Sequence, residues 1–323
     1  RPVGDAMATT IWGTASSWTL TALPLFVWMG EILFRTKLSE NLFKGLSPWM
    51  QKLPGGLIHV NVVGCALFAA ISGSSAATVA TVGKMSIPEL RKRNYPEKIL
   101  LGSLAGSGTL GLLIPPSIIL IIYGVAVQES IAKLFIAGII PGIMIALIFM
   151  SYVIIWSLIN KKEMPKILEE YSFLEKIKRS KQLLPIILLI SSVIGSIYTG
   201  IATATEAASL GVIGALILSY FQKSLTLETF KSSLLGATKT SCMIAFILAG
   251  STFLSLAMGF TGLPRNLALW IQGMELSPYV LILVLMIFYI ILGMFLDGIS
   301  AVVLTMAIIE PMIRQAGFDM IWF

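Results

Sequence analysis

An acidic residue lies inside a long apolar run near the C-terminal end of the sequence. Asp297 falls within the stretch 277–309 and is followed by Gly298 and Ser300. A charged side chain near the middle of a membrane costs at least about 2.5–3.5 kcal/mol on insertion scales, so it requires a partner or a function. We therefore predict that Asp297 belongs to a binding site. The alternative is a protonated or water-exposed carboxyl group near the outer surface.

Two further segments place small polar residues within apolar sequence. One is Ser72-Gly73-Ser74-Ser75, and the other is the stretch 102–117, which contains Gly108, Thr109, Pro115, Pro116 and Ser117. Hard cations prefer oxygen ligands such as hydroxyls and carbonyls. Because a proline removes a backbone donor and clashes with the preceding turn, we expect a half-helix near 98–110, an unwound middle and a second half-helix from about 117 to 127. The alternatives are close helix packing at the serines and a simple proline kink.

Other chemistries lack support in the sequence. His59 is the only histidine, and neither Cys65 nor Cys242 has a neighbour of metal-ligand type, so no His- or Cys-based metal site is expected. The match to G-x-G-x-x-G at 106–111 lies in an apolar span rather than in a strand–turn–helix unit, so we interpret it as chance. The sequence has no Walker A motif, which predicts that the chain does not hydrolyse ATP.

The composition indicates a membrane protein. Of 323 residues, 56% are hydrophobic and 12% are charged, and the mean hydropathy is +0.90. Soluble domains carry about 25% charged residues. The net charge of +7 is scattered among apolar runs, which excludes a contiguous nucleic-acid-binding patch. A membrane span needs about 20 apolar residues, and long apolar stretches lie near 6–34, 55–83, 99–127, 131–159, 183–203, 205–221, 240–260 and 277–309.

The charges between these stretches predict their direction. Lys and Arg are enriched in the gaps 35–52, 84–98, 160–182 and 222–239, which the positive-inside rule places in the cytoplasm. The stretch 55–83 joins two of these gaps but is too short for two crossings, which need about 40 residues. We therefore predict a re-entrant hairpin that enters from the cytoplasm and turns at Ser72–Ser75. Non-helical backbone at membrane depth must be buried in protein or line a watery cavity.

The second half of the chain shows the same order of parts. The interfacial arm 38–53 precedes the first hairpin, and a short arm around 262–265 precedes the apolar run that Asp297 interrupts. Counting crossings places the second hairpin on the opposite face, and inverted repeats with discontinuous helices are the architecture of secondary transporters. We predict an all-α polytopic membrane protein with a first inverted repeat at 1–159, a cytoplasmic interfacial linker at 160–182, and a second repeat at 183–323 that stops before its own broken helix.

Four segments carry a resemblance to one transporter family. The runs 72–83, 102–117, 23–31 and 203–208 are similar to the large membrane subunit of TRAP (tripartite ATP-independent periplasmic) transporters of the DctM or SiaM type. Ala204 departs from the family, which usually has Pro at this position. The resemblance implies an elevator-type fold in the bacterial inner membrane and sodium-driven import of small carboxylates, either C4-dicarboxylates or sialic acid.

The resemblance also implies partners and site residues. The partners are a small four-helix membrane subunit, separate or fused, and a soluble periplasmic substrate-binding protein. The resemblance further implies that Na⁺ is the coupling ion. The first sodium site would use the hairpin tip and the broken helix, at Ser72, Gly73, Ser75, Gly108 and Thr109. Asp297, Gly298 and Ser300 would contribute to a second ion site or to the substrate pocket, and Ser74, Pro115, Pro116 and Ser117 complete the predicted binding set.

Three other functions stay open at this point. A stand-alone Na⁺/carboxylate symporter of similar fold would not need an added binding protein. A passive channel would give a flux that neither saturates nor follows a sodium gradient. An intramembrane hydrolase using Asp297 or a hairpin hydroxyl with His59 would form product without vectorial movement. No catalytic spacing supports the hydrolase, so the sequence predicts that the chain is not an enzyme.

Overall fold

The computed structural model of the chain describes residues 3–36, 38–165, 171–262, 266, 269, 273 and 277–323. Among these residues every regular element is a helix, which confirms the predicted all-α class. The first half contains α1 (Val3–Ala15), η1 (Trp18–Thr21), α2 (Ala22–Phe34), α3 (Leu38–Met50), α4 (Ile58–Ser72), α5 (Ser75–Lys92), α6 (Glu97–Gly108), η2 (Thr109–Leu112), α7 (Ile118–Ala126) and α8 (Ile131–Ile159). The second half contains α9 (Phe173–Ser180), α10 (Leu184–Tyr198), α11 (Ala204–Phe221), α12 (Leu227–Thr261), α14 (Pro278–Gly293) and α15 (Gly298–Gln315).

Several of these helices are long and apolar enough to cross a membrane. Within the described residues there are four, α8, α11, α12 and α15, and up to six if the bent pairs α1–α2 and α9–α10 each count as one span. The stretch 131–159 that the sequence predicts as a span coincides with α8. The chain is therefore a multi-pass membrane protein.

The first predicted span is not one continuous helix. The apolar stretch 6–34 is divided into α1 and α2, which are bent by 55° at a short break. At the break Ser17 adopts an extended backbone with ψ 124°, and the Ser16 hydroxyl donates to the carbonyl of Trp12 across 2.7 Å. Serine side chains compete with the helical backbone in this way, and hydropathy alone does not register such a break.

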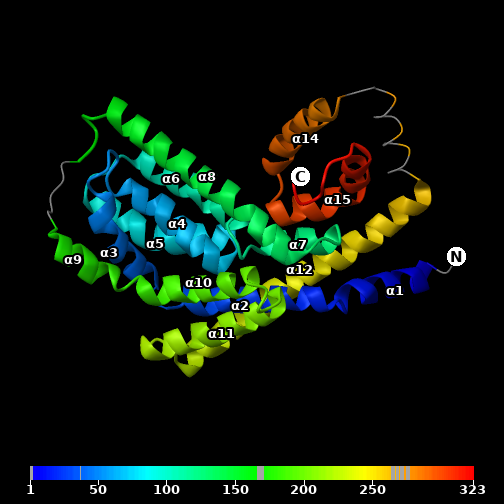
Figure 1. Ribbon diagram of the computed structural model, residues 1–323, viewed down its shortest axis with the longest axis horizontal. Helices are drawn as coiled ribbons and strands as arrows, with labels where there is room; N and C mark the ends of the chain where they lie inside the picture. The colour runs from blue at the N-terminus through cyan, green and yellow to red at the C-terminus, as the bar shows by residue number, and fades with distance from the viewer. Residues whose placement is uncertain are drawn as a thin grey trace.

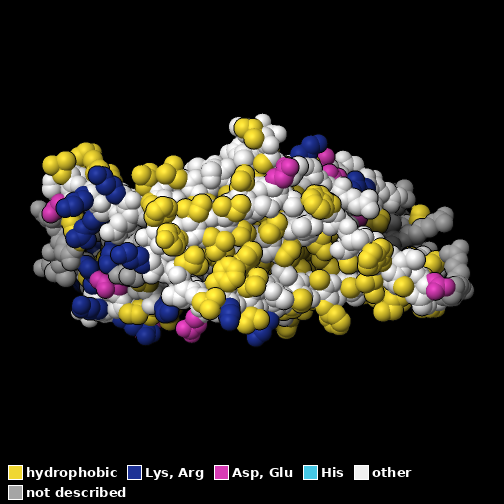
Figure 2. Space-filling view, turned by 90° about the horizontal axis from the view of Figure 1, so that it is seen from below, with side chains coloured by type: hydrophobic (Ala, Val, Ile, Leu, Met, Phe, Trp, Pro, Cys, Tyr) yellow, Lys and Arg dark blue, Asp and Glu magenta, His cyan; other side chains and the backbone are white. Residues whose placement is uncertain are grey.

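The predicted first hairpin is formed by α4 and α5. The N–H of Leu57, next to the start of α4, donates to the Tyr95 hydroxyl across 3.0 Å. Tyr95 follows the end of α5, so both ends of the hairpin lie together, at the end of the molecule that carries α3 and α9 (Figure 1). Figure 2 shows Lys and Arg side chains gathered at this same end. The charge distribution thus agrees with the predicted cytoplasmic side of the hairpin base.

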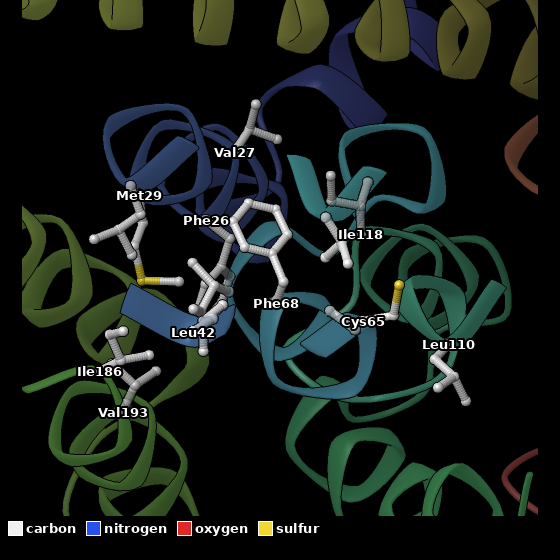
Figure 3. Close-up of a cluster of buried hydrophobic side chains, with 14 of the residues drawn as sticks. Phe26, Val27, Met29, Leu42, Cys65, Phe68, Leu110, Ile118, Ile186 and Val193 are labelled. Atoms are coloured by element: carbon white, nitrogen blue, oxygen red, sulfur yellow. The ribbon is translucent and has the colours of Figure 1, made fainter. Parts of the chain in front are cut away.

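The core lies where α2 packs against the hairpin and its neighbours. Phe26 of α2 and Phe68 of α4 are buried together with Ile118 of α7 (Figure 3). A Cβ added to Gly30 of α2 would lie 3.1 Å from the Cα of Ser72. A larger residue at position 30 would therefore push on the backbone at the hairpin tip, and this close packing fixes the tip against α2.

Candidate functional site

The first hairpin turns within two residues. Helix α4 ends at Ser72, and Gly73 has φ +58°, in the left-handed region that suits glycine. Ser74 then caps α5, because its side chain accepts a hydrogen bond from the N–H of Ala77 at 3.4 Å. The turn therefore falls within the predicted tip, Ser72–Ser75.

Three oxygens meet at this turn. The hydroxyls of Ser72 and Thr78 lie 2.8 Å apart, and the Thr78 hydroxyl donates to the carbonyl of Ser74 across 2.7 Å. Ser72 is 6% exposed and Thr78 is fully buried. Sequence reasoning missed Thr78, although it stands four residues after Ser74, one helical turn along α5. That spacing is the signal that could have found it.

The hairpin tip contacts the broken helix through backbone atoms. The N–H of Ile118, the first residue of α7, donates to the carbonyl of Gly73 across 3.3 Å. A Cβ added to Gly111 would lie 2.9 Å from the carbonyl carbon and oxygen of Ser74. Glycine at 111 therefore permits an approach that any other residue would block. The structure thus brings the two predicted polar segments into direct contact.

Gly108 and Thr109 lie at the end of the first half-helix. A Cβ on Gly108 would lie 3.7 Å from the carbonyl oxygen of Ser75 and would overlap the side chain of Val79, so Gly108 is close to the tip. The Thr109 side chain is exposed, and its hydroxyl donates to the carbonyl of Gly106 across 2.6 Å. Thr109 is therefore near the tip in the fold, but its hydroxyl is directed to its own helix.

The predicted break is present at the two prolines. Helix α6 ends at Gly108, η2 ends at Leu112, and α7 begins at Ile118. Between them Pro115 and Pro116 are joined by a cis peptide bond. The hydroxyl of the fully buried Ser117 donates to the carbonyl of Leu112 across 2.6 Å, which bridges the break. The unwound backbone is thus partly satisfied by a side chain of the same segment.

Asp297 caps the second half of the interrupted apolar run. One carboxylate oxygen accepts from the N–H groups of Ile299 at 3.1 Å and Ser300 at 3.3 Å, and the other accepts from the Ser300 hydroxyl at 2.5 Å. The side chain is exposed. These contacts supply the partners that the charge requires, and they lie at the positive end of the α15 dipole. A water-exposed carboxyl group was the alternative that the sequence left open.

One segment contacts both tips. The backbone of Pro116 and Ile118 lies 3.0 Å from the Cβ position of Gly73. The Cβ position of Gly298 lies 2.9 Å from the side chain of Ile119 and 3.4 Å from that of Leu112. The segment 112–119 therefore connects the first hairpin tip to the second. This convergence is the candidate site.

Other polar residues have structural roles. His59 Nε2 lies 2.8 Å from the carbonyl oxygen of Pro54. Glu206 is exposed and forms a capping box with Thr203 at the start of α11.

Most of the predicted second arm around 262–265 lies outside the described residues. In the described part of the chain no group of three His, Cys, Asp or Glu residues is placed to hold a metal ion.

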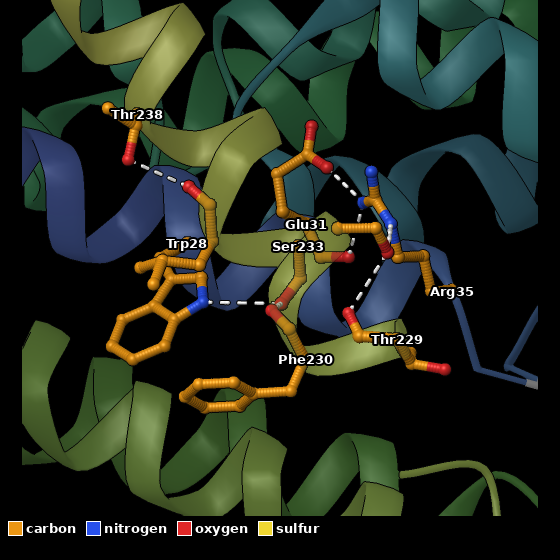
Figure 4. Close-up of polar contacts among 9 residues, drawn as sticks. Trp28, Glu31, Arg35, Thr229, Phe230, Ser233 and Thr238 are labelled. Atoms are coloured by element: carbon orange, nitrogen blue, oxygen red, sulfur yellow. Dashed lines mark hydrogen bonds and ion pairs between the residues drawn. The ribbon is translucent and has the colours of Figure 1, made fainter. Parts of the chain in front are cut away.

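Glu31 forms an ion pair with Arg35 (Figure 4). Arg35 Nε also donates to the Ser232 hydroxyl across 3.0 Å, and the indole N–H of Trp28 donates to the Ser233 hydroxyl across 3.3 Å. These contacts join α2 to α12. They form a structural joint between the two helices.

Comparison with known proteins gives matches along the whole chain. Residues 2–323 match the family described as tripartite ATP-independent periplasmic transporter, DctM component. The C4-dicarboxylate TRAP transporter large permease protein DctM of Pseudomonas aeruginosa is 32% identical over 315 residues, covering 97% of this chain and 73% of that protein. The sialic acid TRAP transporter large permease protein SiaM of Vibrio cholerae is 32% identical over 314 residues, covering 96% and 72%.

This chain matches a smaller share of a third relative. The isethionate TRAP transporter permease protein DctMQ of Oleidesulfovibrio alaskensis is 30% identical over 323 residues, covering 99% of this chain and 50% of that protein. All three relatives are named as transporter permeases and not as enzymes.

Proposed function

The chain belongs to the family of DctM components of tripartite ATP-independent periplasmic transporters, and we propose that it is the large permease of a sodium-driven importer of small carboxylates. Relatives are named for C4-dicarboxylates and for sialic acid, and either carboxylate class suits the proposal. Sodium is a co-transported ion in this scheme, and ATP is not used.

The observation that carries the proposal is the convergence of both tips on the segment 112–119. Non-helical backbone at membrane depth needs protein or a watery cavity around it, and secondary transporters place their substrate and ion sites at such discontinuities. The Gly73 carbonyl is bonded to the Ile118 N–H across 3.3 Å. A movement of the hairpin would therefore carry the broken helix with it, which supports an elevator mechanism in which both move as one body.

The oxygens at the first tip suit a sodium ion. Ser72, Gly73, Ser75 and Thr109 are the proposed ligands, and we add Thr78 because its hydroxyl lies 2.8 Å from that of Ser72. Hard cations prefer hydroxyl and carbonyl oxygens. Since the Thr109 hydroxyl donates to its own helix, this side chain would have to rotate, or contribute its carbonyl, to join the site.

The second tip would contribute a negative charge through the Asp297 carboxylate. Asp297, Gly298 and Ser300 are proposed to hold a second sodium ion or to line the substrate pocket. The Asp297 carboxylate accepts three hydrogen bonds from its own turn, which holds it in place. A carboxylate has about four lone-pair positions, so it retains capacity for a cation.

We propose the partners from the family's description as a tripartite transporter, which implies components besides this chain. A soluble periplasmic binding protein would deliver the substrate, and a small four-helix membrane subunit, separate or fused, would complete the transporter. The proposed location is the bacterial inner membrane. The positively charged end of the molecule, which carries α3 and α9 (Figures 1 and 2), would face the cytoplasm.

Uptake in proteoliposomes tests this function. The complete transporter would be reconstituted, and uptake of labelled succinate and labelled sialic acid would be measured with and without an inward sodium gradient and the binding protein. We expect uptake of one of them that requires both sodium and the binding protein. A potassium gradient of equal size serves as the control for membrane potential and osmotic effects.

The same assay separates the other functions. Sodium-driven uptake without the binding protein would favour a stand-alone symporter. Flux that neither saturates nor responds to sodium would favour a channel. Chemical conversion of the substrate without accumulation in the vesicles would favour an enzyme, and either of these last two results would overturn the proposal.

A further inference from the structure

Helix α9 lies between the two halves of the chain and is strongly inclined to its neighbour. It begins with a capping box, in which Ser172 and Glu175 satisfy each other's backbone groups. The axes of α9 and α10 differ by 55° across a short break. Helix α9 is therefore inclined to the direction in which α10 would cross the bilayer. Its position is at the end of the molecule where basic side chains gather (Figures 1 and 2).

One side of α9 is held by α3. The indole N–H of Trp49 donates to the Ser180 hydroxyl across 2.7 Å. The ring of Trp49 packs edge to face against Phe173 at 6.4 Å, and Lys176 Nζ lies 5.4 Å from the centre of the Trp49 ring. Phe173, Lys176 and Ser180 are spaced by three and four residues, so they share one face of the helix. This contact fixes the rotation of α9 about its axis.

A second face of α9 is left uncovered. Leu174 is 76% exposed and Ile177 is 41% exposed. Lys178 and Lys181 are also exposed, and neither forms an ion pair with any residue that the structure describes. Leu174 precedes Lys178 by four residues and Lys181 by seven, so apolar and basic side chains stand side by side on this face.

We propose that this face of α9 binds anionic phospholipid headgroups of the bilayer. Leu174 and Ile177 would enter the boundary between headgroups and acyl chains, as the apolar face of an interfacial helix does. Lys178 and Lys181 would extend their ammonium groups to the lipid phosphates, since lysine buries its stem along apolar surface and keeps its charge in the polar layer. A soluble anion would use the lysines but would leave the exposed leucine and isoleucine unexplained.

The consequence is an anchor between the two halves of the protein. Helix α9 follows α8 and precedes α10 in the chain, and Trp49 couples it to α3. Attraction to anionic lipid would hold this connection at the membrane surface. This inference goes beyond the proposed transport function, because it concerns the membrane contact of α9 and not the substrate.

A fluorescence experiment on the full chain tests the proposal. The exposed Cys242 would be replaced by Ser, the buried Cys65 would be retained, and Leu174→Cys would be labelled with a bimane dye in nanodiscs. Quenching by brominated phosphatidylglycerol would be compared with quenching by brominated phosphatidylcholine at equal mole fractions. We expect the anionic lipid to quench at least about twice as strongly, because each basic residue near the surface attracts it.

Variants assign the effect to the two lysines. Lys178→Gln with Lys181→Gln should make the two lipids quench equally, and Lys178→Arg with Lys181→Arg should restore the preference. Lys223→Gln with Lys231→Gln, in the basic segment before and at the start of α12, is the matched control and should leave the preference intact.

Three results would overturn the proposal. Equal quenching by both lipids in the chain that retains the lysines would remove the anionic preference. Absence of quenching by either lipid would mean that this face is covered by protein. A preference that survives the double glutamine variant would place the anionic site elsewhere. Elution of each variant as the same species as the parent chain would show that it is folded.

Discussion

The N–H of Ile118 donates a hydrogen bond to the carbonyl of Gly73 across 3.3 Å. This bond joins the tip of one hairpin to the first residue after a broken helix. Gly73 has φ +58°, and its Cβ position lies 3.0 Å from the N atom of Ile118 and from the carbonyl oxygen of Pro116. Both neighbours are backbone atoms, so they have little freedom to move away. The contact therefore requires glycine at position 73.

We expect Gly73→Ala to lower both stability and transport. A left-handed backbone conformation costs an ordinary residue about 1–2 kcal/mol, and the added methyl group would also separate the hairpin from the broken helix. Uptake should fall by about tenfold or more, since about 1.4 kcal/mol corresponds to a factor of ten, and the midpoint of thermal unfolding should fall with it. Gly102→Ala is the control, because Gly102 lies in α6 with no heavy atom within 4 Å of its Cβ position. Wild-type uptake in Gly73→Ala would show that the contact is dispensable.

Thr78→Val should weaken the dependence of transport on sodium. The substitution keeps the shape but removes the hydroxyl that lies between Ser72 and the carbonyl of Ser74. We expect the sodium concentration for half-maximal uptake to rise by about fivefold or more, because one net hydrogen bond is worth about 1 kcal/mol. The measurement is sodium-dependent uptake at saturating substrate.

Thr81→Val is the matched control for Thr78→Val. Thr81 lies on the same helix and is 2% exposed, and its hydroxyl is buried without a hydrogen-bond partner in the described structure. Replacing an unsatisfied hydroxyl by a methyl group should be neutral or stabilising. If both variants shift the sodium dependence equally, the effect belongs to general packing of α5 and not to the tip.

Asp297→Asn should separate the charge of Asp297 from its role as a helix cap. Asparagine caps helices about as well as aspartate, so the unfolding midpoint should change little. Sodium-dependent uptake should fall by about tenfold or more if the carboxylate charge serves transport, since the lost attraction need only be about 1.4 kcal/mol. Asp319→Asn is the control, because Asp319 is also exposed and accepts from the N–H groups of Ile321 and Trp322 at 2.8 and 3.1 Å. Unchanged uptake in Asp297→Asn would remove its charge from the mechanism.

Gly236→Ala should disturb the joint between α2 and α12. The added Cβ would lie 2.8 Å from the carboxyl carbon of Glu31 and 3.2 Å from a guanidinium nitrogen of Arg35, so the ion pair would have to move. We expect a lower unfolding midpoint, equivalent to about 1 kcal/mol or more, as overpacking costs about 1–3 kcal/mol. Gly250→Ala, in the same helix with no atom within 4 Å, should instead be stabilising, because alanine favours the helix by about 1 kcal/mol. Equal effects of the two substitutions would mean that the ion pair tolerates displacement.

The base of the hairpin should lose stability at alkaline pH. Burial raises the pKa of the Tyr95 hydroxyl above its ordinary value of about 10. The folded state therefore holds this proton more tightly than the unfolded state, and its contribution is complete below pH 10 and is lost as pH rises through the folded pKa. Tyr95→Phe removes both the titration and the acceptor for the Leu57 N–H. It should lower the unfolding midpoint at pH 8 and reduce its further decline toward pH 11; an identical decline in the variant would assign the titration to another group.

Particular residues show how far the sequence could predict the fold. The pair Pro115-Pro116 and the glycines before it predict the break between α6 and α7, because proline chemistry is local. The small residues Ser72–Ser75 predict the first turn for a similar reason. The bend between α1 and α2 was not predicted, since hydropathy over the stretch 6–34 does not register the break at Ser16 and Ser17.

The candidate site was predicted in part. The segments that meet were identified from composition, but the exposed Thr109 side chain is directed to its own helix and the buried Thr78 joins the tip instead. The direction of a side chain depends on the rotation of its helix, which is set by packing against other helices. Asp297 was predicted to belong to a binding site, and this stays a prediction; the structure shows an exposed carboxylate that accepts hydrogen bonds from its own turn.

The sequence by itself determined that this chain is an all-helical membrane protein, that its helices break at Ser72–Ser75 and at Pro115-Pro116, and which segments are basic. These properties depend on local chemistry: hydropathy over about 20 residues, the missing N–H of proline and the distribution of Lys and Arg. Only the tertiary structure decided that Gly73 meets Ile118, that Gly298 meets Ile119 and that both tips contact one segment. Such contacts join residues far apart in the chain, and their geometry depends on the packing of several helices at once.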